Sequence, residues 1–395
     1  MLGNMLVSGV LVVFAAIISF SALKWFPVPY LWIFLTWASV FLCALRLVPR
    51  ARAVWTGLVI LCCVFAGLES FFWISGIWIY KDIKAEGTFR WATDNVLGFV
   101  APKGVAETES KSYRGKKLYD VVYTMDANGL RVSSPPSQDT RADRPCVLFF
   151  GNAYTFGWGL NDQETLPYRV AVRSGGKYRV YNLGFLTHGP QQMLAALDHN
   201  LVGKEVECAP RGIRYVIYSA TPDDVRRAAG LRDIDHHHGP RYVLGADGNV
   251  SYHGQFGEDD TMAEKIKSQL AKSFFYRRLV GGDAIYYRRY NNKDIALYLA
   301  IVDSARKHVK ELYPKSEFHV LLWENDAMDK DGTLAKQMLK GLRDEGIIVH
   351  RIDDILPGSA KGKAEYFLGG WDLHPNAMAD DRIAEYVVHN ILKQK

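Results

Sequence analysis

The sequence predicts an α/β domain with a parallel sheet, preceded by three transmembrane helices. Two observations support this fold class. Three stretches near the N-terminus are almost free of charged residues, and each is long enough to cross a bilayer core of about 30 Å as a helix. From residue 146 onward, apolar strand-like runs alternate with helix-like runs. That alternation is typical of a parallel sheet with helices on both faces.

The three apolar stretches lie at residues 1–23, 26–45 and 53–80, and Glu69 is their only charged residue. The first stretch could instead be a cleaved signal peptide, but it lacks a basic N-terminal region and a clear cleavage site. An ionisable group inside hydrocarbon is a candidate functional site. Alternatively, Glu69 lies near the outer headgroups, because the third stretch is longer than a bilayer requires. Both interpretations of Glu69 stay open.

Basic residues predict the orientation of these helices. Arginines at 46, 50 and 52 lie between the second and third stretches, whereas Lys24 alone follows the first. By the positive-inside rule, the arginine loop and the N-terminus are cytoplasmic. We therefore expect a multi-pass protein of the bacterial inner membrane, with everything after residue 80 in the periplasm or outside the cell. The helices would contact the bilayer and offer a surface to a membrane-protein partner.

Charge and cysteine content narrow the function classes. The formal net charge is +6 and the pI is about 8.9, and the basic residues are interspersed with acidic ones, so nucleic-acid binding is not indicated. Two of the five cysteines, Cys146 and Cys208, belong to the outer part of the chain. In a sheet of order 2-1-3-4-5 both lie at the amino ends of neighbouring strands. A disulfide between them is possible if their Cα atoms come within about 7 Å.

We expect three domains along the chain: the anchor at 1–80, a β-rich juxtamembrane region and linker at 81–144, and the α/β domain at 145–395. The juxtamembrane region should contain a hairpin, because the β-rich run 118–124 precedes the turn signal Asp126-Ala127-Asn128-Gly129. In the α/β domain we expect strands at 146–150, 178–183, 214–219, 318–323 and 346–351. We expect helices at 164–174, 190–201, 292–313 and 332–345.

Residues 228–290 interrupt the alternation of strands and helices. Within them we expect a hairpin around 246–249 and a polar helix at about 261–273. Ligands of such sheets bind at the carboxyl ends of the strands, and an insertion after the third strand would lie over that edge. It is therefore a candidate lid or substrate-selecting element.

The turn after the first strand of the α/β domain carries the most specific pattern in the chain. It reads Gly151-Asn152-Ala153 and is followed by Tyr154 and by glycines at 157 and 159, then Asp162, Glu164, Thr165 and Pro167. This segment resembles the first block of the SGNH (GDSL-type) hydrolases, whose turn reads Gly-Asp-Ser with the serine as nucleophile. The resemblance implies a flavodoxin-like three-layer domain. Ala153 stands at the nucleophile position, so the chain as written cannot perform that chemistry.

Two further segments match the family less closely. Gly184, after the second strand, stands where the family has a glycine whose N–H contributes to the oxyanion hole. The third block should end in Gly-x-Asn-Asp, but this chain has Ala220-Thr221-Pro222-Asp223, so the oxyanion Asn is missing. The resemblance implies an oxyanion hole built from the N–H groups of Ala153 and Gly184, with Thr221 as a further donor. Asn152, Tyr154 and Asp223 are expected to contact substrate.

Asp372 and His374 near the C-terminus resemble the last block of the family, a loop with one Asp and one His before the terminal helix. The imidazole takes the proton of the nucleophile, while the carboxylate fixes its tautomer and stabilises the imidazolium. We therefore expect His374 to be the general base and Asp372 its partner. The resemblance covers residues 145–392.

Ala153 has two explanations. Natural loss would leave a binding module with a shaped pocket, and a deliberate Ser-to-Ala replacement would disable an enzyme. One missing hydroxyl in an otherwise preserved constellation favours the replacement. The run His236-His237-His238 indicates a surface loop rather than a metal site, because ligands spaced around it are lacking. No metal or cofactor is expected.

The resemblance implies a serine esterase or deacylase acting on an O-acylated lipid or glycan of the cell envelope. Three membrane spans would place its site close to the bilayer. An O-acyltransferase of envelope polysaccharide is the alternative within the same family. Outside enzymes, the chain could be a natural pseudoenzyme or a binding subunit of an envelope complex.

Overall fold

The computed structural model describes residues 2–26, 28–80, 82–136, 144–208, 212–231, 239–258, 261–270, 272–276, 278, 290–325, 331–369 and 372–394. They form two compact units, Met1–Asp82 with Asp259–Tyr287, and Ile83–Glu258 with Arg288–Lys395. This division differs from the three predicted domains. The juxtamembrane region joins the α/β unit, and the insertion is shared between both units.

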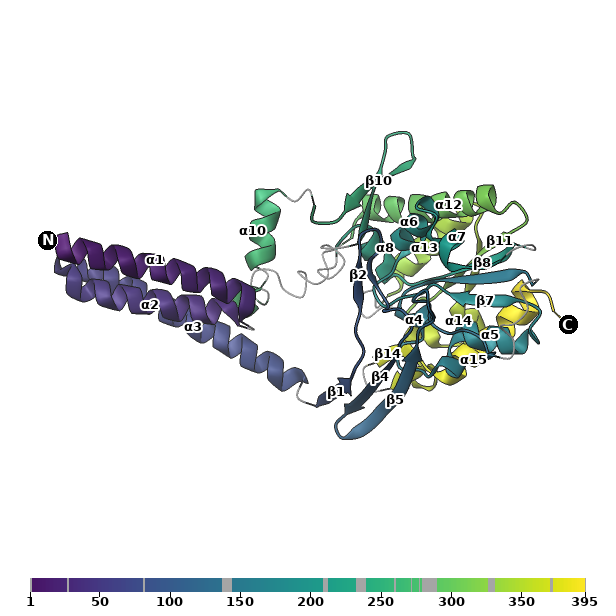
Figure 1. Cartoon of the computed structure of the whole chain (residues 1–395), viewed down its shortest axis with the longest axis horizontal. Coiled ribbons are helices and arrows are strands. Elements are labelled where there is room, and N and C mark those ends of the chain that lie inside the picture. The colour runs from purple at the N-terminus through teal and green to yellow at the C-terminus, as the bar shows by residue number, and fades with distance from the viewer. Residues whose placement is uncertain are drawn as a thin grey trace. The chain divides into compact units, whose positions relative to one another are not determined.

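The first unit contains the long N-terminal helices α1 (Leu2–Trp25), α2 (Pro29–Leu47) and α3 (Arg52–Tyr80), with the short turn η1 (Pro49–Ala51) between the last two. α1 packs on α2, and α2 packs on α3 (Figure 1). α2 and residues Arg52–Ser75 of α3 are long and apolar enough to cross a membrane, with mean hydropathies of 1.7 and 2.1. The apolar part of α1, Gly9–Trp25, is shorter. Two candidate spans are therefore established, and the third stays a prediction.

A five-stranded parallel sheet forms the centre of the second unit. Its spatial order is β12-β11-β8-β6-β7, which is the predicted 2-1-3-4-5 arrangement in chain order. The strands are β6 (Cys146–Gly151), β7 (Arg179–Asn182), β8 (Ile213–Ala220), β11 (Glu317–Leu322) and β12 (Ile348–Arg351). Each lies within about two residues of its predicted range, because continuous apolar runs mark strands that are buried on both faces.

Helices cover both faces of this sheet (Figure 1). Alternate residues of β6 point to opposite sides, with Leu148 in one apolar cluster and Phe149 in the other. One face is covered by α6 (Pro190–Asp198), α7 (Leu201–Glu205), α8 (Asp223–Ala228), α12 (Asn292–Leu312) and α13 (Thr333–Asp344). The other is covered by α5 (Leu166–Arg173), α14 (Ile352–Ile355), α15 (Ala377–Tyr386) and the π-helical turn η8 (Val387–Ile391).

The β-rich juxtamembrane region builds an antiparallel sheet of order β1-β4-β5, from β1 (Ile83–Gly87), β4 (Ala106–Tyr113) and β5 (Lys116–Thr124). Between β1 and β4 in sequence, β2 (Ala92–Asp94) and β3 (Gly98–Val100) form a small antiparallel ladder. The predicted hairpin joined β5 to the residues after the turn at 126–129, and the structure pairs β5 differently. β5 pairs with β4, and after the turn Arg131 makes only isolated bridges, to Met125 and Asn182. The Arg131 side chain is fully buried.

Hydrophobic side chains of β5 attach this region to the α/β unit. Tyr119, Val121 and Tyr123 pack in one cluster with Phe156 and Phe185. Such an apolar contact binds the two segments into one folding unit. The region is therefore part of the site-bearing unit rather than a separate domain.

The insertion contains the expected hairpin, β9 (Pro240–Leu244) and β10 (Val250–Gln255), and the expected polar helix, α10 (Met262–Leu270), followed by the single turn α11 (Phe274–Tyr276). The histidine run at 236–238 lies outside the described residues. A lid role for the insertion stays a prediction.

Cys146 and Cys208 form a disulfide with a Cα–Cα distance of 5.7 Å. The sequence analysis left this bond open, and the distance condition is met. Disulfides persist in oxidising compartments, so the bond agrees with a location outside the cytoplasm.

Candidate active site

The turn after β6 places residue 153 at the start of a short helix. Gly151 has φ +150°, and a Cβ there would lie 2.8 Å from the carbonyl oxygen of Ser219, so glycine is required for the close approach of β8. Asn152 then caps α4 (Ala153–Phe156) by accepting a hydrogen bond from the N–H of Tyr154 at 2.9 Å. Ala153 therefore occupies the first helical position at the carboxyl edge of the sheet, as the resemblance implies.

Asn152 is buried and pairs with Asp224. Its Nδ2 donates to Oγ1 of Thr221 at 3.0 Å and to Oδ1 of Asp224 at 3.3 Å. Burial raises the pKa of Asp224 to about 6, although Arg227 and donors from Thr221 and Tyr218 oppose that rise. An aspartate at position 152 would place a second carboxylate against Asp224, which is unfavourable. The amide of Asn152 is thus matched to the buried carboxyl group of Asp224.

Asp372 and His374 form a close pair on β14 (Asp372–Pro375), which pairs with β13 (Phe367–Gly369). Oδ1 of Asp372 accepts hydrogen bonds from Nδ1 of His374 at 2.6 Å and from its backbone N–H at 3.1 Å. This contact places the proton on Nδ1 and leaves Nε2 as the basic nitrogen. The Asp372 side chain is 1% exposed and that of His374 is 29% exposed.

The structure brings this pair to the first motif. β14 packs against α4, and the Tyr154 ring lies 5.4 Å from the His374 ring in an edge-on contact. Tyr154 directly follows Ala153 in the chain. Segments more than 200 residues apart in the sequence therefore meet, and His374 contacts the residue that follows Ala153.

Lys111 of β4 completes the surroundings of Asp372 and was not predicted from the sequence. Its Nζ donates to Oδ2 of Asp372 at 3.1 Å, and the Lys111 side chain is only 13% exposed. Burial alone would raise the pKa of Asp372, but the hydrogen bond and charge of His374 and the charge of Lys111 hold it well below its usual range. Each carboxylate oxygen thus has its own donor, and one donor comes from the juxtamembrane region.

Replacing Lys111 should destabilise the protein in a pH-dependent way. Because the pKa of Asp372 is depressed in the folded state, its contribution to stability is present above the unfolded value of about 3.9 and is lost as pH falls through the folded pKa. We expect Lys111→Met to lower the free energy of unfolding by about 1–3 kcal/mol at pH 7, and by less as pH falls below about 4. Thermal unfolding of the purified protein across this pH range measures the difference.

Lys117→Met provides the control for that measurement. Lys117 pairs with Asp120 on the same hairpin, but the two side chains are 64% and 58% exposed, so the change should cost little at any pH. The charge of Lys111 also acts on Glu109, whose pKa burial raises above its usual value although bonds from Tyr123 and Tyr119 oppose that rise. An equal loss of stability in the two lysine variants would contradict the role of Lys111.

The two backbone N–H groups predicted for the oxyanion hole differ in whether they already donate a hydrogen bond. We find no acceptor for the N–H of Ala153 within the described part of the chain. The N–H of Gly184 donates to Oδ1 of Asn182 at 3.0 Å. A Cβ at Gly184 would lie 2.6 Å from Cβ of Thr155, so close packing explains this glycine. Its oxyanion role stays a prediction that requires the bond to Asn182 to open.

Both the backbone N–H and the hydroxyl oxygen of Thr221 have hydrogen-bond partners inside the fold. Its N–H donates to Oδ2 of Asp224 at 2.9 Å, and its Oγ1 accepts from Asn152. A hydroxyl that accepts one hydrogen bond still has its own proton to donate. Thr221 can therefore contribute to an oxyanion hole through its hydroxyl group only.

The other predicted substrate contacts also have partners inside the fold. The Tyr154 hydroxyl accepts a hydrogen bond from Nδ2 of Asn325 at 3.0 Å. Asp223 pairs with Arg226 at 3.4 Å and with Arg227 at 3.3 Å. Direct contacts of Asn152, Tyr154 and Asp223 with substrate stay predictions. Asn325 lies beside the site without having been predicted, because only the fold brings it to Tyr154.

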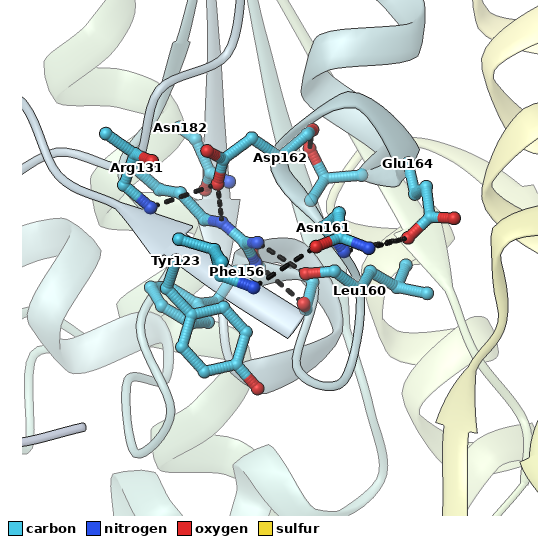
Figure 2. A network of polar contacts seen from close by, with 12 residues as sticks. Tyr123, Arg131, Phe156, Leu160, Asn161, Asp162, Glu164 and Asn182 are labelled. Atoms are coloured by element: carbon cyan, nitrogen blue, oxygen red, sulfur yellow. Dashed lines mark hydrogen bonds and ion pairs between the residues drawn. The ribbon is translucent and has the colours of Figure 1, made fainter. Parts of the chain in front are cut away.

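Arg131 fixes the loop that follows α4, and Figure 2 shows its contacts. Its guanidinium donates to the carbonyl oxygens of Phe156 and Gly157 at 2.6 Å each, and to that of Leu160 at 2.5 Å. Nε also donates to Oδ1 of Asp162 at 3.1 Å. The side chain is fully buried. The segment that resembles the first family block is thus held by the juxtamembrane region.

A partly open cavity with a volume of about 100 Å³ lies beside Gly151. Gly151 and Gly184 line it together with apolar side chains that include Leu183 and Met193. His188 also lines it, and burial lowers the pKa of His188 to about 4, so this imidazole is neutral at physiological pH. Within the described residues, no group of three or more His, Cys, Asp or Glu could hold a metal ion.

Comparisons with known proteins give matches to solved structures alone. No family model matches the sequence, and no curated protein matches it. A G-D-S-L family lipolytic protein from Desulfitobacterium hafniense is 12% identical with a TM-score of 0.36, over 62% of this chain and 98% of that one. An acetyl xylan esterase from Butyrivibrio proteoclasticus is 9% identical with a TM-score of 0.34, over 64% of each chain.

A third similar structure is an acetyl xylan esterase from Geobacillus stearothermophilus, 12% identical with a TM-score of 0.34, over 64% of this chain and 97% of that one. The similar structures thus include G-D-S-L lipolytic proteins and acetyl xylan esterases. At this identity and TM-score, no substrate or activity is transferred to this chain.

Proposed function

We propose that residues 145–392 form an acyl-ester site of the SGNH type that lacks the nucleophile and the oxyanion Asn of that pattern. The observation that supports this most strongly is the 2.6 Å contact between Asp372 and His374, packed against the helix that begins at Ala153. With serine at 153, Nε2 of His374 takes the hydroxyl proton as the oxygen attacks the ester carbonyl. The imidazolium then returns a proton to the leaving alcohol.

The proposed active form is a membrane-anchored esterase or O-acyltransferase. The anchor would hold the site near the bilayer, which favours an O-acylated lipid or envelope glycan as substrate. The cavity beside Gly151 and Gly184 is smaller than the cavity of about 150 Å³ that accommodates benzene. That size favours a short acyl group such as acetyl. Water as acceptor gives hydrolysis, and a sugar hydroxyl gives transfer.

A natural binding protein is the second candidate, and the Asn152–Asp224 pair favours it. The fold has accommodated the departure at position 152 with a buried partner, which a single deliberate replacement at 153 does not explain. Such a protein would bind acylated glycan or lipid at the same site without turnover. Both candidates share the ligand class and differ only at residue 153.

Covalent labelling tests the proposal. A fluorophosphonate probe reacts only with an activated serine, so we expect Ala153→Ser to gain one adduct mapped to position 153 by mass spectrometry. The chain as written and the double variant Ala153→Ser, His374→Ala should stay unlabelled. A folded Ala153→Ser protein without adduct would refute the assignment of the base, whereas an adduct without ester turnover would favour the binding protein.

A further inference from the structure

The Glu69 carboxylate is fully buried within the first unit. Its oxygens accept hydrogen bonds from Oγ of Ser273 at 2.8 Å and from the N–H groups of Phe274 and Phe275 at 2.8 and 2.9 Å. Burial of a carboxylate is costly unless it is hydrogen-bonded, and charge-assisted bonds of this kind are strong. A residue of an apolar helix is therefore used to hold a segment of the insertion.

Further contacts fasten the same segment to the three N-terminal helices. The Phe275 ring lies 5.4 Å from that of Phe65 in α3. Nζ of Lys272 donates to the carbonyl oxygen of Leu23 at the end of α1, at 3.0 Å. The Tyr30 hydroxyl, at the start of α2, donates to the carbonyl oxygen of Gln269 at 3.1 Å. α10 is thus held at the end of the bundle where α1 ends and α2 begins.

This end of the bundle has the features of an outer membrane interface. At a rise of about 1.5 Å per residue, Glu69 lies about 26 Å along α3 from Arg52, close to the far side of a bilayer core of about 30 Å. Near the same end, α1 and α2 expose Phe20, Trp25 and Trp32, with 73%, 74% and 45% of each residue accessible. Exposed aromatic residues are typical of the boundary between lipid and water.

We propose that α10 lies in the outer membrane interface and contacts anionic phospholipid. Met262 and Ile266 are 74% and 53% exposed, and their i, i+4 spacing places them on one side of the helix. In sequence, residues 261–278 carry five basic residues and one acidic residue. An apolar helix face combined with a basic segment binds membranes that contain anionic lipid. Met262 and Ile266 border a hollow that Tyr30, at the start of α2, also lines.

This inference rests on the proposed membrane anchoring and is independent of the ester chemistry. Within the first unit, the Glu69 carboxylate ties residues 273–275 of the insertion to the anchor.

Environment-sensitive labels test the position of α10 in the full chain. In a Cys43→Ala, Cys62→Ala, Cys63→Ala background, an NBD label is placed at Ile266→Cys, and the protein is reconstituted in nanodiscs with and without phosphatidylglycerol. Ile60→Cys, 58% exposed in α3, reports whether the bundle is in lipid. Val243→Cys on β9, 37% exposed, is the aqueous control. We expect iodide to quench the label at 266 about fivefold less than that at 243, with stronger protection in anionic lipid.

The possible results distinguish a failure of the membrane anchor from a failure of the interfacial position of α10. Water-like quenching at both 60 and 266 would overturn the membrane anchor itself. Protection at 60 with full quenching at 266 would overturn the interfacial position of α10. Glu69→Leu should raise quenching at 266 to within about twofold of the control, and Ser273→Ala, which removes one of the three bonds, should have a smaller effect. Unchanged protection in both variants would contradict the role of Glu69.

Discussion

Ala153→Ser is expected to raise ester turnover by about 10³–10⁴-fold over the chain as written. An intact nucleophile and base contribute about 2 × 10⁶ in kcat in a serine hydrolase, whereas loss of one oxyanion donor lowers kcat by about 10²–10³-fold. Here one donor is lost, because the oxyanion Asn of the SGNH pattern has no counterpart, whereas the N–H of Gly184 is expected to leave Asn182 for the oxyanion. The expected gain is therefore the factor for nucleophile and base divided by the factor for one lost oxyanion donor. Initial rates on p-nitrophenyl acetate measure it.

The specificity of this gain depends on His374. The double variant Ala153→Ser, His374→Ala keeps the added hydroxyl but loses the base, so its rate should return to within about tenfold of the chain as written. Longer acyl chains should react more slowly than acetyl, because the neighbouring cavity of about 100 Å³ is small. Equal activity with and without His374 would mean that the hydroxyl reacts without the Asp372–His374 pair.

Features that depend on local pattern could be predicted from the sequence. The strands of the parallel sheet are continuous apolar runs, their alternation with helices predicted a parallel sheet, and the assumed order 2-1-3-4-5 agrees with the observed one. The turn at 151–153 and the Asp372–His374 pair are short motifs, so their local geometry agrees with expectation. Each of these features is encoded within a few neighbouring residues.

Partners that are distant in sequence could not be predicted, because no local pattern encodes them. Lys111 lies in a strand of mainly polar residues and nothing in its surroundings distinguishes it from Lys117, yet the fold buries one against Asp372 and leaves the other exposed. Glu69 was correctly singled out as unusual, but neither interpretation included Ser273. The structure adds a third role, in which the carboxylate binds a segment of the same chain.

Arg131 lies just after the predicted turn at 126–129, and its replacement is expected to cause the largest loss of stability. Arg131→Met removes the donor to three carbonyl oxygens and the partner of Asp162, all around the loop at 156–162. The Arg131 side chain is fully buried and that of Asp162 is 19% exposed. Breaking a buried ion pair costs about 3–5 kcal/mol, and the three carbonyl oxygens lose their donor as well, so we expect a loss of about 4 kcal/mol. Arg131→Lys should recover little of it, because an ammonium group lacks the planar set of donors that reaches all four acceptors.

Arg173→Met is the matched control, because Arg173 also makes a two-pronged contact with a carboxylate, to Asp381 at 3.1 and 2.7 Å. The side chains of Arg173 and Asp381 are each 35% exposed, so this pair should contribute less than about 1 kcal/mol to stability. Denaturant unfolding of the three variants and the parent protein gives the comparison. Similar losses for Arg131→Met and Arg173→Met would show that the buried contacts do not hold the loop. A large loss confined to position 131 would show that the α/β unit depends on the juxtamembrane region to keep residue 153 and His374 together.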